Sequence, residues 1–179
     1  MLLTGGSSSR MGRDKAMIVV DGKTLAVRAA GALAAVAAPC IEVGPGVSGL
    51  PAVQEEPAGG GPLAAVAAGA SAMEAGLATL VVACDLPWLS SDVLRWLASH
   101  PAAGSVVPLW EARPQPLCAR WSPAALATAI ALVGEGARSM QALLHRADAV
   151  LVEPPEHLAR ALADVDTPEQ LAEVPGVHS

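Results

Sequence analysis

Residues 79–87 read TLVVACDLP, an apolar run that ends in an acidic residue and a proline. Within it, residues Leu80–Ala83 show no alternation of polar and apolar side chains, which indicates a strand that is buried on both faces. Strands of that kind occur in parallel sheets that are covered by helices on both sides. The stretch therefore predicts an α/β protein, provided that helices and further strands surround it.

Short apolar runs and Ala/Leu-rich segments of helical length do alternate along the whole chain. This alternation predicts βαβ units and a three-layer α/β/α fold with a mostly parallel central sheet. The expected strands are Met1–Leu3, Cys40–Val43, Ala52–Gln54, Thr79–Cys84, Ser105–Leu109, Leu117–Trp121 and Ala149–Val152. The expected helices are Leu25–Ala37, Pro62–Ala75, Ser91–Ser99, Pro123–Leu132, Ser139–His145 and Pro168–Glu173.

The composition fits one domain that spans residues 1–179, of which only the last few residues after Val174 are expected to form a loose tail. Hydrophobic residues make up 53% of the chain, which excludes disorder over most of its length. Because Phe and Tyr are absent, we expect a core of Ala, Val, Leu and Ile. The first strand has only three or four residues before the glycines, so we expect the natural start to lie slightly upstream.

Positive charge is concentrated near the start of an acidic protein. The formal net charge of −6 excludes a general nucleic-acid-binding surface or an anionic-membrane surface. The chain has only two lysines, Lys15 and Lys23, and both lie in the first 23 residues together with Arg10 and Arg13. This uneven distribution indicates an anionic ligand that binds locally.

The three cysteines are far apart and show no CxxC or Cys/His spacing, so neither a zinc site nor a disulfide framework is predicted. A reducing compartment fits this usage. The start lacks the pattern of a signal peptide, and proline and glycines interrupt the uncharged residues 57–73, which excludes a plain membrane helix there. We therefore expect a cytoplasmic protein without membrane contact.

Residues 4–15 read TGGSSSRMGRDK and directly follow the first expected strand. The adjacent glycines Gly5 and Gly6 let the backbone turn sharply and expose consecutive N–H groups, which suits phosphate oxygens. Serine hydroxyls, Arg10 and Lys15 add donors and charge. The stretch matches neither GxxxxGK[ST] nor GxGxxG, so a solvated Ser/Gly loop is the alternative reading.

Asp85 follows another expected strand, and its carboxylate would be costly there unless it were solvated or paired with a cation. In open α/β sheets ligands bind beyond the carboxyl ends of the strands, so Asp85 and the Gly5–Lys15 segment are expected at the same edge. An Asx turn or helix cap is one interpretation of the Asp-x-Pro pattern. The other is a Mg²⁺ ligand, since Mg²⁺ prefers hard oxygen donors.

The stretch GGSSSRMGRDKA resembles the signature loop of the MobA-like nucleotidyltransferases, whose pattern is roughly Gly-Gly-x-Ser-x-Arg-Met-Gly-x-Asp-Lys-Ala. The matching positions are Gly5, Gly6, Ser8, Arg10, Met11, Gly12, Asp14, Lys15 and Ala16. The resemblance implies a Rossmann-like nucleotidyltransferase fold in which this loop wraps a nucleoside triphosphate. It also implies catalytic roles for Lys15, Arg10 and Asp85, and Mg²⁺ as a cofactor at Asp85. The nucleotide-binding residues that it implies are Leu3, Thr4, Gly5, Gly6, Ser7, Lys15, Glu55, Gly61 and Asp85.

The segment EEPAGGGPLAAVAAG, residues 55–69, carries two of these positions. From the residues alone it reads as a tight connection between a strand and a helix that begins near Pro62. The resemblance implies instead that Glu55 recognises the base and that Gly61 shapes the pocket wall. A carboxylate suits guanine, because it can accept hydrogen bonds from the ring N–H and the exocyclic amine together. The family usually has Asp at this position.

Three further segments resemble the side of the family's site that binds the acceptor. RPQPLCARW contributes Arg113 and Gln115, EGARSMQALL contributes Arg138 and Ser139, and DVDTPEQL contributes Asp166. From the residues alone, Pro-x-Pro could begin an edge strand and Thr167-Pro168 could cap a helix. Asp166 could bind a second metal or the acceptor. Guanylyltransferases often have asparagines where this motif has the aspartates Asp164 and Asp166. The aspartates are common in cytidylyl-type relatives instead.

The resemblance is strongest to the molybdenum cofactor guanylyltransferases of this family. It implies transfer of GMP from GTP to the terminal phosphate of molybdopterin, with transient contact to other molybdenum cofactor biosynthesis proteins or acceptor enzymes. Two alternatives stay open at this point. One is a cytidylyltransferase or sugar-phosphate nucleotidyltransferase of the same fold, and the other is a non-catalytic nucleotide-binding regulatory domain.

Overall fold

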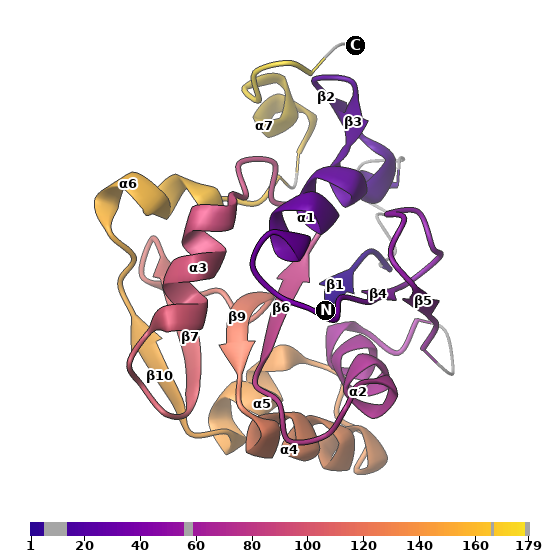
Figure 1. Cartoon of the computed structure of the whole chain (residues 1–179), viewed down its shortest axis with the longest axis vertical. Helices are drawn as coiled ribbons and strands as arrows, with labels where there is room; N and C mark the ends of the chain where they lie inside the picture. Colours follow the sequence, from indigo (N-terminus) through magenta and orange to yellow (C-terminus); the bar gives the residue numbers. More distant parts are fainter. Residues whose placement is uncertain (6–13, 56–58, 166, 178–179) are drawn as a thin grey trace.

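The strand Thr79–Ala83 (β6) lies inside an eight-stranded sheet in the computed structural model, which describes residues 1–5, 14–55, 59–165 and 167–177 (Figure 1). The strand order is β10-β7-β9-β6-β1-β4-β5, and β8 pairs with β7 beside this path. The other strands are β1 (Leu2–Leu3), β4 (Glu42–Val43), β5 (Ala52–Val53), β7 (Ser105–Trp110), β8 (Arg113–Pro114), β9 (Cys118–Trp121) and β10 (Ala149–Val152). All seven expected strands are present, and β8 was not predicted.

In the eight-stranded sheet four of the seven strand pairs are parallel, as expected for a mostly parallel sheet, and β8 runs antiparallel to β7. The pairs β1–β4, β1–β6, β4–β5 and β7–β10 are parallel, whereas β9 runs antiparallel to both β6 and β7. Because β9 is antiparallel to both of its neighbours, β7 and β6 point in the same direction. The carboxyl ends of β10, β7, β6, β1, β4 and β5 therefore meet at one edge of the sheet.

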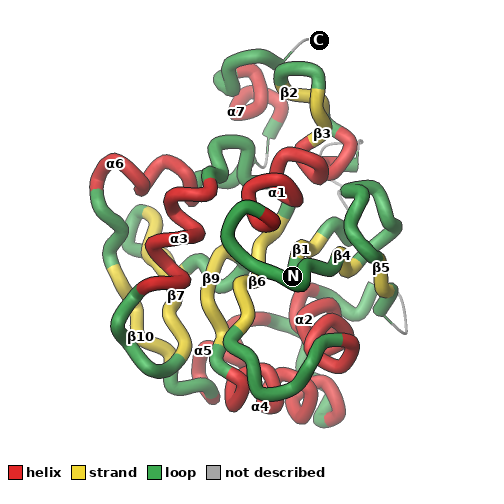
Figure 2. Tube along the Cα trace, viewed as in Figure 1, coloured by secondary structure: helices red, strands yellow, loops and turns green. Residues whose placement is uncertain are grey.

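Helices cover both faces of the sheet (Figure 2). The helices α1 (Leu25–Ala34), α3 (Ser91–Ser99) and α6 (Glu156–Ala159) with the 3-10 helix η2 (Arg160–Leu162) pack on one face. The helices α2 (Pro62–Ala72), α4 (Pro123–Gly134) and α5 (Met140–Arg146) pack on the other. Two further helices lie near the edge, η1 (Lys15–Met17) and α7 (Pro168–Ala172).

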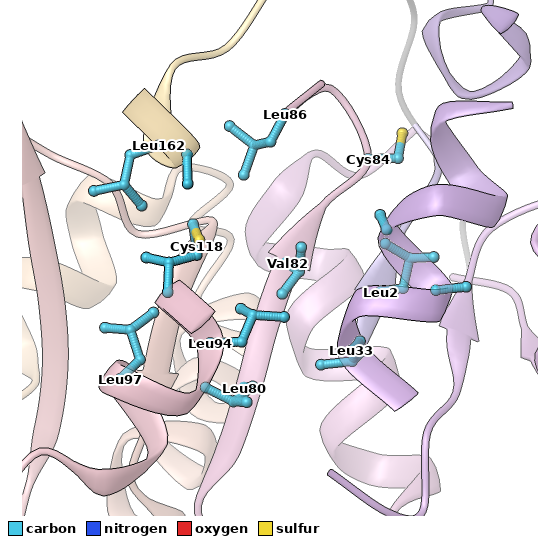
Figure 3. Close-up of a cluster of buried hydrophobic side chains, with 14 of the residues drawn as sticks. Leu2, Leu33, Leu80, Val82, Cys84, Leu86, Leu94, Leu97, Cys118 and Leu162 are labelled. Carbon is cyan, nitrogen blue, oxygen red and sulfur yellow. The ribbon is translucent and has the colours of Figure 1, made fainter. Parts of the chain in front are cut away.

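The side chains of β6 alternate between these two layers. Leu80 and Val82 contact the α1/α3 layer, as Figure 3 shows, while Val81 contacts the α2/α4 layer. The strand is therefore buried on both faces, which confirms the prediction from its uninterrupted apolar run. Within the described residues, no helix combines the length and apolarity that a membrane span requires.

The C-terminal segment differs from the prediction. The residues after Val174 were expected to be loose, but Val177 forms a β-bridge with Val20, and the Asp21 N–H donates to the carbonyl oxygen of Gly176 at 3.0 Å. Val20 belongs to a two-stranded hairpin that the sequence did not predict, β2 (Val19–Val20) and β3 (Lys23–Thr24). A turn at Asp21 and Gly22, both with positive φ, connects its strands, and exposed Lys23 follows the turn.

Candidate active site

The described part of the signature loop begins at the carboxyl end of β1, between two parallel neighbours. The Thr4 N–H donates to the carbonyl oxygen of Val43 at 3.1 Å, and the Cys84 N–H donates to that of Leu3 at 3.1 Å. The ends of β4, β1 and β6 are thus aligned by backbone hydrogen bonds. This alignment places Gly5 and Asp85 at one edge, as the rule for ligand sites in α/β sheets predicts.

Lys15 and Asp85 form an ion pair at this edge. The Lys15 Nζ lies 3.4 Å from the Asp85 Oδ2, and the two side chains are 17% and 28% exposed. Lys15 begins η1, whose N-cap residue Asp14 accepts a hydrogen bond from the Ala16 N–H at 3.0 Å. Asp14 thus has a local capping role, while η1 directs Lys15 toward the end of β6.

A second carboxylate lies near Asp85. The Val165 N–H donates to the Asp85 carbonyl oxygen at 3.1 Å, which brings the preceding residue, Asp164, to the same edge. Burial raises the pKa of Asp85, Lys15 lowers it, and the charge of Asp164 raises it further. Among the described residues, two carboxylates and one ammonium group therefore lie near one another at this point. Asp164 was not among the predicted site residues, although its motif was.

Cys84 precedes Asp85 and is buried in the α1/α3 layer. Burial, Asp85 and Asp14 together raise the pKa of its thiol to about 12. A thiol with such a pKa stays protonated at neutral pH and is a poor nucleophile. Cys84 is therefore a core residue.

Glu55 follows β5 by two residues and lies farther along the same edge. Its Oε1 accepts a hydrogen bond from the Gly59 N–H at 2.8 Å. Its Oε2 is buried, yet no described residue donates a hydrogen bond to it. Buried polar atoms are nearly always paired, so an unpaired carboxylate oxygen is a good acceptor for a ligand donor.

Gly61, which was predicted to line the nucleotide pocket, packs against Arg138, which was predicted to bind the acceptor. Its φ is +90°, and a Cβ at this position would lie 3.0 Å from the Arg138 carbonyl oxygen. The same oxygen accepts a hydrogen bond from the Leu63 N–H at 3.4 Å, in the first turn of α2, where no side-chain cap is present. Arg138 and Ser139 are exposed, and Ser139 is the N-cap residue of α5.

The segment with Arg113 and Gln115 lies beside the end of β6. The Ala83 N–H donates to the carbonyl oxygen of Leu117 at 2.7 Å, and the Gln115 N–H donates to that of Pro108 at 2.8 Å. The Gln115 Nε2 donates to the Arg113 carbonyl oxygen at 3.3 Å. Arg113 is exposed and follows a tight turn at the carboxyl end of β7, which points in the same direction as β6.

Leu3 and Thr4 lie behind the edge. Both are 5% exposed, and Leu3 packs in the α2/α4 layer, so their side chains are part of the interior. Four of the predicted site residues, Gly6, Ser7, Arg10 and Asp166, lie outside the described residues. Within the described residues, no group of three or more His, Cys, Asp or Glu side chains could hold a metal ion.

Glu42 was not among the predicted site residues. Glu42 lies in β4, is fully buried, and accepts hydrogen bonds from Thr4 and from the loop that follows its strand. The available signal was an acidic residue inside the apolar run CIEV, because a buried charge must be compensated by partners.

The whole edge and its flanking elements match one protein family. The model of the MobA-like NTP transferase domain matches residues 1–165, which include Lys15, Glu55, Asp85 and Asp164. The chain belongs to the MobA-like NTP transferase family. The family is one of nucleotidyltransferases, and the matched range contains both partners of the ion pair.

Curated relatives in this family carry more specific names. A probable molybdenum cofactor guanylyltransferase of Mycobacterium bovis is 34% identical over 163 residues, which are 85% of this chain and 81% of that protein. A protein of the same name from Mycobacterium avium is 35% identical over 183 residues, with coverage of 96% and 91%. Both alignments extend over most of each chain.

Solved structures agree with the fold of this MobA-like chain. Molybdopterin-guanine dinucleotide biosynthesis protein A from Archaeoglobus fulgidus superposes with a TM-score of 0.76 at 20% identity, covering 97% of this chain and 94% of that one. The 2-C-methyl-D-erythritol 4-phosphate cytidylyltransferase of Thermus thermophilus gives 0.69 at 19% identity, with coverage of 97% and 95%. At these identities the likeness concerns the fold.

Proposed function

We propose that this MobA-like protein transfers GMP from GTP to the terminal phosphate of molybdopterin, with molybdopterin guanine dinucleotide and pyrophosphate as products. The observation that carries the proposal is the Lys15–Asp85 ion pair beside Asp164, at the carboxyl edge of a parallel sheet. The names of the mycobacterial relatives support guanylyl transfer to this acceptor.

In this proposal the nucleotide extends along the edge. The loop that begins at Gly5, together with Lys15, binds the triphosphate, and Glu55 recognises the base from the end of β5. The strand order β6-β1-β4-β5 separates Asp85 from Glu55 by three strand spacings, or about 14 Å. The unpaired Oε2 and its neighbour Oε1 supply the two acceptors that the N–H groups of guanine require.

The acceptor would approach from the opposite flank of Asp85. Arg113 and Gln115 lie beside the end of β6, and Asp166 is proposed to act on this side as well. Arg138 and Ser139 would bind another part of the same molecule, a role supported by the close approach of the Arg138 backbone to Gly61. Arginine side chains suit this role because the guanidinium group pairs with phosphate through two donors.

The chemistry requires little acid–base assistance from the protein. The terminal phosphate of the acceptor is already anionic at neutral pH, attacks the α-phosphorus of GTP, and forms the new P–O bond as the bond to the pyrophosphate leaving group breaks. Lys15 and the loop N–H groups neutralise charge on the phosphates and hold them in place. Asp85 and Asp164 supply hard oxygen donors that fit Mg²⁺, which when bound neutralises phosphate charge and orients the acceptor.

The direct test is release of pyrophosphate with each nucleotide and acceptor in the presence of Mg²⁺. We expect release with GTP and molybdopterin, and loss of activity when EDTA removes the metal. Release with CTP would favour the second candidate, a cytidylyltransferase, which the aspartates of the DVDTP motif support. No release from any pair, with nucleotide binding intact, would favour a non-catalytic binding domain.

A further inference from the structure

The carboxylate of Glu42 is the most extensively hydrogen-bonded acidic group in the described part of the chain. Its Oε1 accepts hydrogen bonds from the Thr4 hydroxyl at 2.5 Å and from the N–H groups of Gly46 and Val47 at 2.7 and 3.0 Å. Its Oε2 accepts from the N–H and the hydroxyl of Ser48 at 2.8 and 2.5 Å. Five donors thus hold one fully buried carboxylate.

These donors come from two different parts of the chain. Four of them belong to the loop that follows β4, whereas the fifth, the Thr4 hydroxyl, belongs to the end of β1. The loop donors alone would satisfy much of the hydrogen-bonding capacity of the carboxylate. The bond to Thr4 is therefore a connection between β4 and the residue after which the phosphate-binding loop begins.

Gly44 makes this connection sterically feasible. A Cβ at position 44 would lie 2.2 Å from the Thr4 Oγ1 and 2.8 Å from the Gly5 nitrogen. The Thr4 side chain and the Gly5 backbone thus occupy the space that a side chain at position 44 would need. In addition, the Thr4 N–H donates a hydrogen bond to the carbonyl oxygen of Val43, so the backbone of Thr4 is held as well as its side chain.

We propose that Glu42 is a positioning residue, which fixes the Thr4 hydroxyl and thereby the backbone of Gly5 for binding the phosphates of a nucleotide. The inference rests on the proposed nucleotide site and adds a buried anchor to it. Charge-assisted hydrogen bonds are stronger than neutral ones, so the Thr4 side chain is held in a single orientation. A site that is held in its binding geometry before the ligand arrives loses less free energy on binding.

The chain offers a matched pair of variants that separates positioning from support of the fold. Thr4→Val and Ser48→Ala each remove one hydroxyl that donates to Glu42 at 2.5 Å, but only Thr4 leads into the phosphate-binding loop. Both variants should lower the melting temperature. Binding of GTP with Mg²⁺, measured by calorimetry, then reports what each hydroxyl does for the site.

We expect Thr4→Val to weaken GTP binding at least about tenfold, and Ser48→Ala to change it by less than about threefold. Thr4→Ser, which restores a hydroxyl, should recover most of the affinity that Thr4→Val loses. Equal effects of Thr4→Val and Ser48→Ala, or an unchanged affinity in both, would overturn the positioning role. If the unmodified protein binds neither GTP nor CTP, the proposed function falls and this inference falls with it.

Discussion

The ammonium group of Lys15 lies 3.4 Å from the carboxylate of Asp85, a residue 70 positions later in the chain. The two residues belong to different elements: Lys15 begins the 3-10 helix η1, and Asp85 follows the end of β6. Among the described residues, Asp164 is a second carboxylate near this ion pair, and carboxylate oxygens are the donors that Mg²⁺ prefers.

Removal of either member of this pair should abolish most of the turnover. In the proposed mechanism, Lys15→Ala takes away charge that would stabilise the phosphates, and Asp85→Ala takes away the proposed Mg²⁺ ligand. By analogy with oxyanion-hole deletions, each should lower kcat at least about a hundredfold. Pyrophosphate release measures this effect, and circular dichroism checks that the variants fold.

The matched control is the exposed ion pair of Asp92 and Arg95, whose atoms lie 2.7 Å apart on α3. Exposed pairs contribute little to stability, so Asp92→Ala should keep the turnover of the unmodified protein. Near-normal turnover in a folded Asp85→Ala protein would contradict the metal assignment.

Glu55→Gln should weaken GTP binding more than CTP binding. The substitution keeps the size of the side chain but replaces one acceptor oxygen with a donor amide, which cannot accept from guanine. We expect a loss of about tenfold to a hundredfold in GTP affinity, as for other hydrogen bonds to charged groups. Glu74→Gln, at an exposed position away from this edge, serves as the control in the same calorimetric titration. Equal losses for the two nucleotides would argue against base recognition by Glu55.

Gly61→Ala should destabilise the protein and disturb the site. The φ at position 61 is +90°, which residues with a side chain rarely adopt. The added Cβ would also lie 3.0 Å from the carbonyl oxygen of Arg138. Backbone strain of this kind costs about 1–3 kcal/mol. Gly136→Ala is a matched control, because Gly136 has the same φ but no described atom lies within 4 Å of its added Cβ. Urea unfolding should show the larger loss for Gly61→Ala, and only that variant should weaken GTP binding.

The pKa of Glu42 predicts a loss of stability in acid. Burial alone would raise this pKa, but hydrogen bonds from Ser48 and Thr4 and from the backbone of Ser48 and Val47 outweigh burial and lower it from 4.5 to about 2. Between these values the unfolded chain binds the proton more readily than the folded one. The stabilisation is therefore complete above pH 4.5 and is lost as the pH falls toward 2.

A shift of this size corresponds to about 3 kcal/mol in the free energy of unfolding. Urea unfolding at a series of pH values across this window measures it. Glu42→Gln has no carboxyl at this position and should show a smaller decrease over the same window, although it starts from a lower stability. An identical pH dependence in the two proteins would show that other groups cause the acid sensitivity.

Arg120 should support the fold without affecting the site. Its guanidinium group donates to the carbonyl oxygens of Ala98 and His100, both at 2.9 Å, and to those of Ala102 and Gly104. Arg120→Met leaves these acceptors without their charged donor and should lower the free energy of unfolding by about 2–3 kcal/mol. Thermal unfolding measures the loss, and an unchanged affinity for GTP confirms that the site is intact.

The main helices and strands of the fold were predictable because they follow from local sequence patterns. The uninterrupted apolar run of β6 indicated burial on both faces, and Val81 and Val82 indeed contact opposite helical layers. The Thr167 cap was predictable for the same reason, since capping bonds join residues only a few positions apart. The hairpin β2–β3 was missed because its strands are short, and the Val20–Val177 bridge joins distant segments.

At the site, the sequence alone showed which residues follow the strands: a glycine-rich stretch with Lys15 after β1, and an acidic residue after β6. These features lie within a few residues of a strand, so they could be read without the fold. The tertiary structure decided which groups meet, namely Asp164 with Asp85, Gly61 with Arg138, and Thr4 with Glu42. Such pairs depend on the order of the strands and the packing of loops, which short-range patterns do not encode.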